Sequence, residues 1–232
     1  MKNPPDSVRM KKAIPILFED RYLIAFNKPA NLLVIPSPNN HNQTLVDIVN
    51  EQYPTQENSG KLHPCHRLDK ETSGVILFAK GKKNQAVMMK LFQDQLMEKS
   101  YLAFVQGRLK NLKGTIRQPL KHRFASRSTK KDLLQDAVTN YKVNKQMQGF
   151  SVVEVYPLTG RTNQIRIHFS QMGHPILGDR KFSVAKNYPL KFKRAALHAH
   201  QVRFLHPLTK KQVTIKSPLP KDMEVFLARH SN

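Results

Sequence analysis

Residues 66–74 read HRLDKETSG and run directly into residues 75–79, VILFA, an unbroken apolar run. Such a run beside a polar turn predicts a strand buried on both faces of a sheet. A short polar loop that leads into a core strand holds its side chains rigidly, as chemistry requires. Taken alone, Arg67 and Asp69 are more typical of an exposed ion pair.

The pattern of apolar residues on either side of this stretch predicts the rest of the fold. Strands are predicted at 14–18, 22–27, 101–109, 137–144, 150–157, 197–204 and 212–216, and helices at 44–53, 84–97, 162–172 and 221–230. Many strands with a few separated helices predict an α+β fold, built on a largely antiparallel mixed sheet with flanking helices. Residues 1–12 are predicted to form a flexible arm, and residues 13–232 a single domain.

The composition narrows the classes of partner. The chain has 39 Lys and Arg against 16 Asp and Glu, a net charge of +23. The half from residue 117 onward is the more basic, with 22 basic and 6 acidic residues. This charge favours a polyanion such as nucleic acid, or an anionic membrane surface; the alternative is a solvated basic surface.

Several other classes are excluded. The longest apolar runs are far shorter than the ~18 residues of a membrane span. The start of the chain is polar and basic, unlike a secretory signal. The single cysteine fits a reducing compartment, so we expect a cytoplasmic protein without membrane association.

The sequence does not favour a cysteine–histidine catalytic pair or a histidine metal site. Cys65 and His66 are neighbours on an extended segment, so their side chains point to opposite faces and cannot form a nucleophile–base pair. His198 and His200 would share a strand face near His206, but no carboxylate or second cysteine completes a ligand set. We therefore expect no metal and favour structural or basic-face roles for these histidines.

Two further motifs accompany the first one. Residues 99–103, KSYLA, open a strand, and residues 160–168, GRTNQIRIH, form a turn that enters a helix. In this order the three segments resemble the HRLD-x-x-TSG, K-x-Y-x-A and GRT-x-Q-I-R-x-H motifs of the RluA family of pseudouridine synthases. Residues 27–34 and 174–179 resemble two other segments of the family more weakly. The whole resemblance spans residues 14 to 217. Two positions depart from the family pattern: Asn31 replaces the usual Gly, and Asn163 the usual His.

The resemblance implies the pseudouridine synthase catalytic fold and its reaction. That reaction breaks the C1′–N1 bond of a uridine in RNA, rotates the uracil and joins C1′ to C5, without a cofactor. By the resemblance Asp69 is the essential carboxylate, ionised at neutral pH with an ordinary pKa of ~3.9. Arg166 would be its planar, bidentate partner, and Tyr101 would stack on the base and serve the proton step. The route by which Asp69 acts, through C1′, the ring or a glycal, stays open.

The resemblance also implies how RNA is held. The target uridine must be flipped out of its stack. Arg67 would fill the vacated space, and Ile165 would form an apolar wall under the uracil. A basic segment, residues 121–131, is either a solvated loop or an RNA clamp; its cations are Lys121, Arg123, Arg127, Lys130 and Lys131.

We therefore expect a monomeric RNA pseudouridine synthase. The segment at residues 27–34 that resembles the family's entry motif starts at Asn27, which leaves no room for a preceding RNA-binding domain. This favours a small target, a tRNA or an rRNA hairpin. The alternatives are a non-catalytic RNA-binding or RNA-chaperone protein and, more distantly, a structural ribosome-associated protein. An intact Asp69 amid so much positive charge favours the enzyme.

Overall fold

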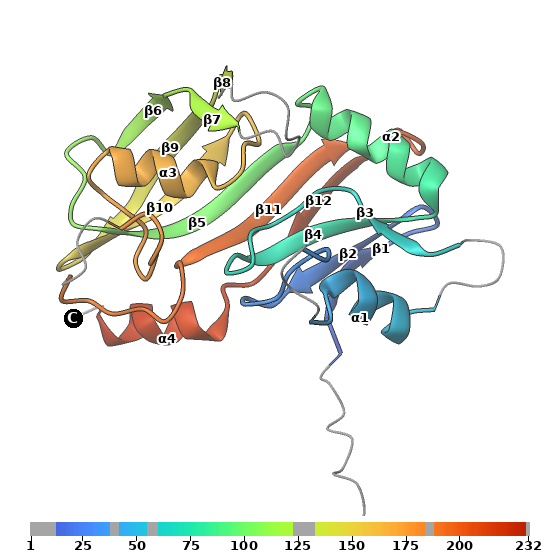
Figure 1. Cartoon of the computed structure of the whole chain (residues 1–232), viewed down its shortest axis with the longest axis horizontal. Helices are drawn as coiled ribbons and strands as arrows, with labels where there is room; N and C mark the ends of the chain where they lie inside the picture. Colours follow the sequence, from blue (N-terminus) through green and yellow to red (C-terminus); the bar gives the residue numbers. More distant parts are fainter. Residues whose placement is uncertain (1–12, 38–41, 55–59, 123–132, 184–187, 231–232) are drawn as a thin grey trace, which may run out of the picture.

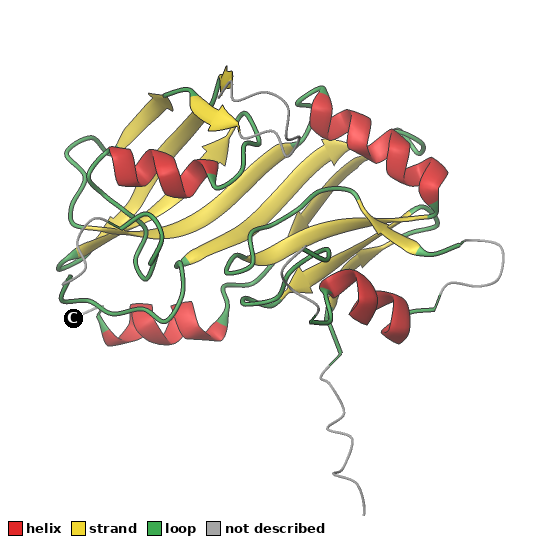
Figure 2. Ribbon diagram, in the orientation of Figure 1, coloured by secondary structure: helices red, strands yellow, loops and turns green. Residues whose placement is uncertain are grey.

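The computed structural model describes residues 13–37, 42–54, 60–122, 133–183 and 188–230, and the predicted arm at 1–12 lies outside them. Its centre is a ten-stranded sheet flanked by helices (Figures 1 and 2). The strands are β1 (Ile16–Glu19), β2 (Leu23–Lys28), β3 (Leu62–Pro64), β4 (Ser73–Lys80), β5 (Glu98–Gln106), β6 (Lys113–Arg117), β7 (Leu120–His122), β8 (Leu133–Gln135), β9 (Val138–Gln146), β10 (Phe150–Pro157), β11 (Leu197–Leu205) and β12 (Gln212–Lys216). The helices are α1 (Leu45–Gln52), α2 (Lys82–Gln93), α3 (Gln164–Gln171) and α4 (Lys221–Arg229).

The order of the strands joins distant parts of the chain. The main path is β1-β2-β4-β11-β5-β10-β9-β6, with β12 beside β11 and β3 beside β4, while β7 and β8 form a separate pair. Only β4 and β11 pair in parallel; the other described pairs are antiparallel. At this parallel contact Gly74 has a φ of +111°, and a Cβ there would lie 2.1 Å from the carbonyl oxygen of Ala199. Glycine therefore permits the close approach. The predicted α+β fold on a largely antiparallel mixed sheet is confirmed.

Strand β4 explains the apolar run that follows the first motif. Its alternate residues Ile76 and Phe78 belong to the core that includes Leu45 and Val49 of α1. Its other residues, including Leu77, belong to the core that includes Met88 of α2. Because both faces are covered, every apolar position along β4 is buried. The loop that precedes β4 thus starts from a fixed strand.

The predicted elements are found, with different ends. Helix α1 begins after Thr44, whose backbone N–H donates to the Asp47 carboxylate at 2.9 Å. Helix α2 ends at Gln93, before its predicted end at residue 97, because Gln95 takes a left-handed φ of +57°. Strands β3, β6, β7 and β8 were not predicted, since they have three to five residues each and little apolar alternation. None of the described helices is long and apolar enough to cross a membrane.

Candidate active site

A cleft of about 490 Å³ is lined by residues of α2, β5, β11, the segment that precedes β4 and the connection from β10 to α3. Its first wall is the segment 65–72 between β3 and β4, here called the Asp69 loop, together with α2. Its second wall is the β10–α3 connection, which carries Arg161. The floor includes Lys99 and Tyr101 of β5. The motifs that resemble the RluA family therefore meet in one cleft.

Asp69 is held in the loop that its neighbours fix. Its carbonyl oxygen accepts a hydrogen bond from the Thr72 N–H at 3.1 Å, which closes a turn. Its carboxylate lies 3.6 Å from Nη1 of Arg166 and is about a quarter exposed. Burial raises the pKa of Asp69 above its ordinary value, although the charges of Arg166 and Arg67 oppose the rise. The expectation of an unperturbed carboxyl group is therefore wrong.

The bidentate partner of Arg166 is Asp179, not Asp69. Nε and Nη2 of Arg166 donate to the two Asp179 carboxylate oxygens at 2.7 and 2.9 Å. Nη1 donates to Oδ1 of Asn163 at 3.0 Å, and Glu71 lies 3.5 Å from Nη2. The predicted pairing of Arg166 with Asp69 holds only as a 3.6 Å ion pair, because the fork of the guanidinium is already occupied.

Asp179 supports the site through Arg166, a role that was not predicted from the sequence. Its side chain is fully buried. Burial raises the pKa of Asp179, but the hydrogen bonds and charge of Arg166 and the N–H groups of Phe182 and Lys181 outweigh it, so the pKa is lowered. The signal in the sequence that could have identified Asp179 was its place in HPILGD, residues 174–179, which weakly resembles a family motif. Asp179 stays ionised and fixes the guanidinium that faces Asp69.

Lys28 lies beneath the Asp69 loop and was also missed. It is fully buried, and its ammonium donates to the carbonyl oxygens of Lys70 and Thr72 at 3.1 and 2.8 Å. Burial, and then the charge of Arg194, lowers the pKa of Lys28 to about 7, while Asp69 opposes this. The one indication in the sequence was the weak resemblance of residues 27–34 to the family's entry motif.

Arg194 ties the same loop to the C-terminal helix. Its Nε and Nη2 donate to both carboxylate oxygens of Asp222 in α4, at 2.8 and 3.0 Å. Its Nη1 donates to the Glu71 carbonyl oxygen at 3.1 Å, and Nη2 lies 3.4 Å from Oγ of Ser73. The loop is thus supported by two buried cations from separate parts of the chain.

The other predicted site residues divide into three groups. Tyr101 and Ile165 line the cleft, and Arg67 is exposed where the loop opens to solvent. Lys121 is exposed on β7 and is not among the cleft residues. The remaining predicted cations fall outside the described residues: Arg123, Arg127, Lys130 and Lys131.

Both departures from the family pattern have a structural account. Asn31 and Asn163 have left-handed φ angles of +64° and +55°. Asparagine tolerates this conformation better than most residues, so Asn31 can stand where glycine is usual. The Asn163 side chain, which stands where the family usually has His, accepts a hydrogen bond from Arg166.

The cysteine and histidine residues have structural environments. Burial raises the pKa of Cys65 to about 12, so the thiolate is unavailable at neutral pH. Nε2 of His66 accepts the Leu77 N–H at 3.1 Å. Nδ1 of His198 lies 3.0 Å from Oγ of Ser73, and His206 accepts two backbone N–H groups. The described residues contain no group of three or more His, Cys, Asp or Glu placed to hold a metal.

Comparison with known proteins decides the family. Residues 22–171 match the family model described as RNA pseudouridylate synthase. The chain belongs to this family. The match includes the Asp69 loop, β5 and all of α3.

Relatives and solved structures agree. The ribosomal large subunit pseudouridine synthase D of Xylella fastidiosa is 33% identical over 96% of this chain and 71% of its own length. The dual-specificity RNA pseudouridine synthase RluA of Vibrio cholerae is 35% identical over 84% of this chain and 78% of its own length. The solved structure of human RNA pseudouridylate synthase domain containing 4 covers 92% of both chains, with a TM-score of 0.76 and 26% identity.

This pseudouridine synthase is therefore an enzyme that acts on RNA and isomerises uridine to pseudouridine. The predicted RluA-family membership, fold and enzyme class are confirmed. The comparisons give no support to a non-catalytic RNA-binding or chaperone protein.

Proposed function

We propose that the enzyme modifies uridine in a folded tRNA or rRNA and uses Asp69 as its reacting carboxylate. The observation that carries the proposal is the placement of the Asp69 carboxylate in the cleft, 3.6 Å from the buried guanidinium of Arg166. The names of the relatives, one a large-subunit synthase and one of dual specificity, support RNA of these two classes. The proposal includes a single catalytic domain over residues 13–232, which acts as a cytoplasmic monomer.

The cleft walls suit a flipped uridine. Ile165 provides an apolar surface and Tyr101 an aromatic one, so a uracil ring between them exchanges water for packing. Asp69 then acts at the bond between sugar and base, and Arg166 keeps the carboxylate charged and oriented. Arg67, exposed at the opening of the cleft, fills the space that the base leaves in the RNA.

The decisive test of the proposal is Asp69→Asn, which keeps the size of the side chain and removes its charge. We expect loss of tritium release from RNA labelled at uridine C5, with RNA binding retained. Glu224→Gln is the matched control, because it removes one negative charge from an exposed position on α4. Substantial turnover by Asp69→Asn, or no release by the wild-type enzyme from any cellular RNA, contradicts the proposal.

A second test concerns the hydroxyl group of Tyr101. Burial, and then the charge of Asp69, raises the pKa of Tyr101, so its hydroxyl is neutral at working pH. It can then relay the C5 proton as a neutral donor and acceptor, rather than remove it as a phenolate. We expect Tyr101→Phe to lower the yield of pseudouridine by ~10²–10⁴-fold while RNA affinity changes little. A Phe variant with the wild-type yield leaves Tyr101 with stacking alone.

A further inference from the structure

Lys99 opens β5 and is a cleft residue to which the mechanism gives no role. It shares a strand face with Tyr101, two residues further on, and both line the cleft. Its side chain is half-buried. Within the described residues no carboxylate lies within ion-pair distance of its ammonium group. The buried cations Lys28, Arg166 and Arg194, in contrast, all have oxygen partners.

Among the described residues, no neighbouring charge raises the pKa of Lys99. Burial, and then the charge of Lys99, lowers the pKa of His66 to about 3, so this imidazole is neutral. Burial likewise lowers the pKa of Lys99. Partial burial of an ammonium group without a negative partner costs desolvation free energy. A bound anion from outside the protein offsets this cost.

We propose that Lys99 binds a phosphodiester oxygen next to the flipped uridine. The inference rests on the proposed function, because in an RNA substrate the anionic groups are phosphates while the uracil is neutral. Alternate residues on a strand are about 7 Å apart, a separation that one nucleotide spans. With the base against Tyr101, a flanking phosphate reaches the ammonium of Lys99. Lysine binds phosphate as a point charge with three donors.

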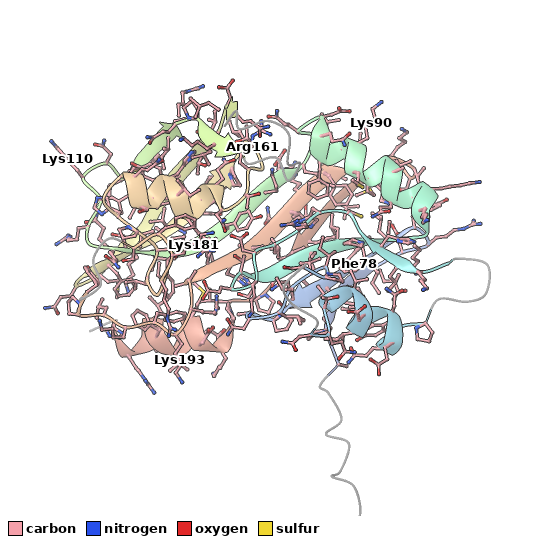
Figure 3. All side chains as sticks on the ribbon, viewed as in Figure 1. Phe78, Lys90, Lys110, Arg161, Lys181 and Lys193 are labelled. Atoms are coloured by element: carbon pink, nitrogen blue, oxygen red, sulfur yellow. The ribbon has the colours of Figure 1, made fainter. Side chains whose placement is uncertain are left out.

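The first experiment measures RNA affinity against salt concentration. The probe is a synthetic hairpin RNA that contains a uridine from which the wild-type enzyme releases tritium. Lys99→Met keeps the length of the side chain and removes its charge, so we expect the slope of log affinity against log salt to fall by about 1. Lys99→Arg restores the slope. Lys193→Met is the matched control, because Lys193 is exposed beside α4, far from α2 (Figure 3).

The second experiment replaces single phosphates of the same hairpin with neutral methylphosphonates, one on each side of the target uridine. For the wild-type enzyme, one replacement lowers affinity roughly ten- to a hundredfold, the usual effect of a lost charged hydrogen bond. For Lys99→Met, the same replacement has no further effect, because the contact is already gone. Fully additive effects at both phosphates overturn the proposal. If the wild-type enzyme releases tritium from no cellular RNA, so that no such hairpin can be chosen, the proposed function itself is overturned.

Discussion

Two groups of cations meet at the Asp69 loop, and they differ in whether the protein supplies their negative partners. The buried group donates to carboxylates and backbone carbonyl groups and consists of Lys28, Arg166 and Arg194. The cleft group has no ion pair with any described residue and consists of Arg67 and Lys99. Burial without partners costs several kcal/mol per charge. The partnered cations therefore hold the Asp69 loop, whereas Arg67 is exposed to solvent and Lys99 is the half-buried cation for which we propose an RNA phosphate.

The comparison also explains the placement of Asp69. Its carboxylate lies between the two groups, paired at 3.6 Å with the buried guanidinium of Arg166 and still partly exposed to the cleft. A stronger bidentate pair would occupy both carboxylate oxygens. Because the two bidentate donors of Arg166 bind Asp179, Asp69 keeps only the 3.6 Å ion pair, and its carboxylate remains about a quarter exposed.

The largest effect on stability is expected where a buried cation loses its partner. Asp179→Asn breaks the ion pair with Arg166, and we expect the free energy of unfolding to fall by ~3 kcal/mol. This is the lower end for such pairs, because Asp69 and Glu71 stay near the guanidinium. Urea unfolding measures the change. Glu19→Gln is the control, since the exposed pair with Lys80 should contribute less than ~1 kcal/mol. Equal losses in both variants contradict the comparison.

A second effect depends on pH. The pKa of Lys28 is about 7 in the folded protein and 10.5 ordinarily, so between these values the unfolded chain binds a proton that the folded chain does not. Stability from this group therefore rises with pH across that window, by at most ~1.4 kcal/mol per pH unit. Urea unfolding at two pH values in the window measures the change. Between the lower and the higher pH, the free energy of unfolding of the wild type should rise relative to that of Lys28→Met, but not relative to that of Lys193→Met. Parallel pH dependence of the wild type and Lys28→Met contradicts this.

The smallest effect is expected for cations that face RNA only through phosphates. If the predicted clamp contacts phosphates, replacing Lys130 and Lys131 by Gln lowers the salt slope of RNA affinity by about 1 to 2. Lys191 and Lys193, both exposed, provide a control pair with the same loss of charge. An unchanged slope assigns residues 121–131 to a solvated loop.

The sequence predicted the fold where patterning and local chemistry agree. The apolar run of β4 and the Thr44 cap of α1 correctly placed a strand and a helix. The end of α2 was predicted wrongly because Leu96 continues the apolar period, yet its side chain is 60% exposed after the chain turns at Gln95. Periodicity carries no information on such a turn.

For the site, the sequence predicted which residues gather but not how they pair. Asp69, Tyr101, Ile165 and Arg166 do meet in the cleft. The choice of Asp179 as the partner of Arg166 depends on how the segment after α3 folds back. The burial of Lys28 could not be inferred from residue type, because lysine is almost never buried without partners.

The position of β11 has a consequence for biosynthesis. Among the described strands, those on the Asp69 side, β2 and β4, and those on the Tyr101 side, β5 and β10, are joined in the sheet only through β11. Strand β11 ends at Leu205, so a nascent chain holds both halves of the cleft long before it can bring them together. Until that strand emerges, two sheet edges stay open to wrong pairing. Among the described strands, the two halves of the cleft are therefore brought together when β11 has been made and has paired with both β4 and β5.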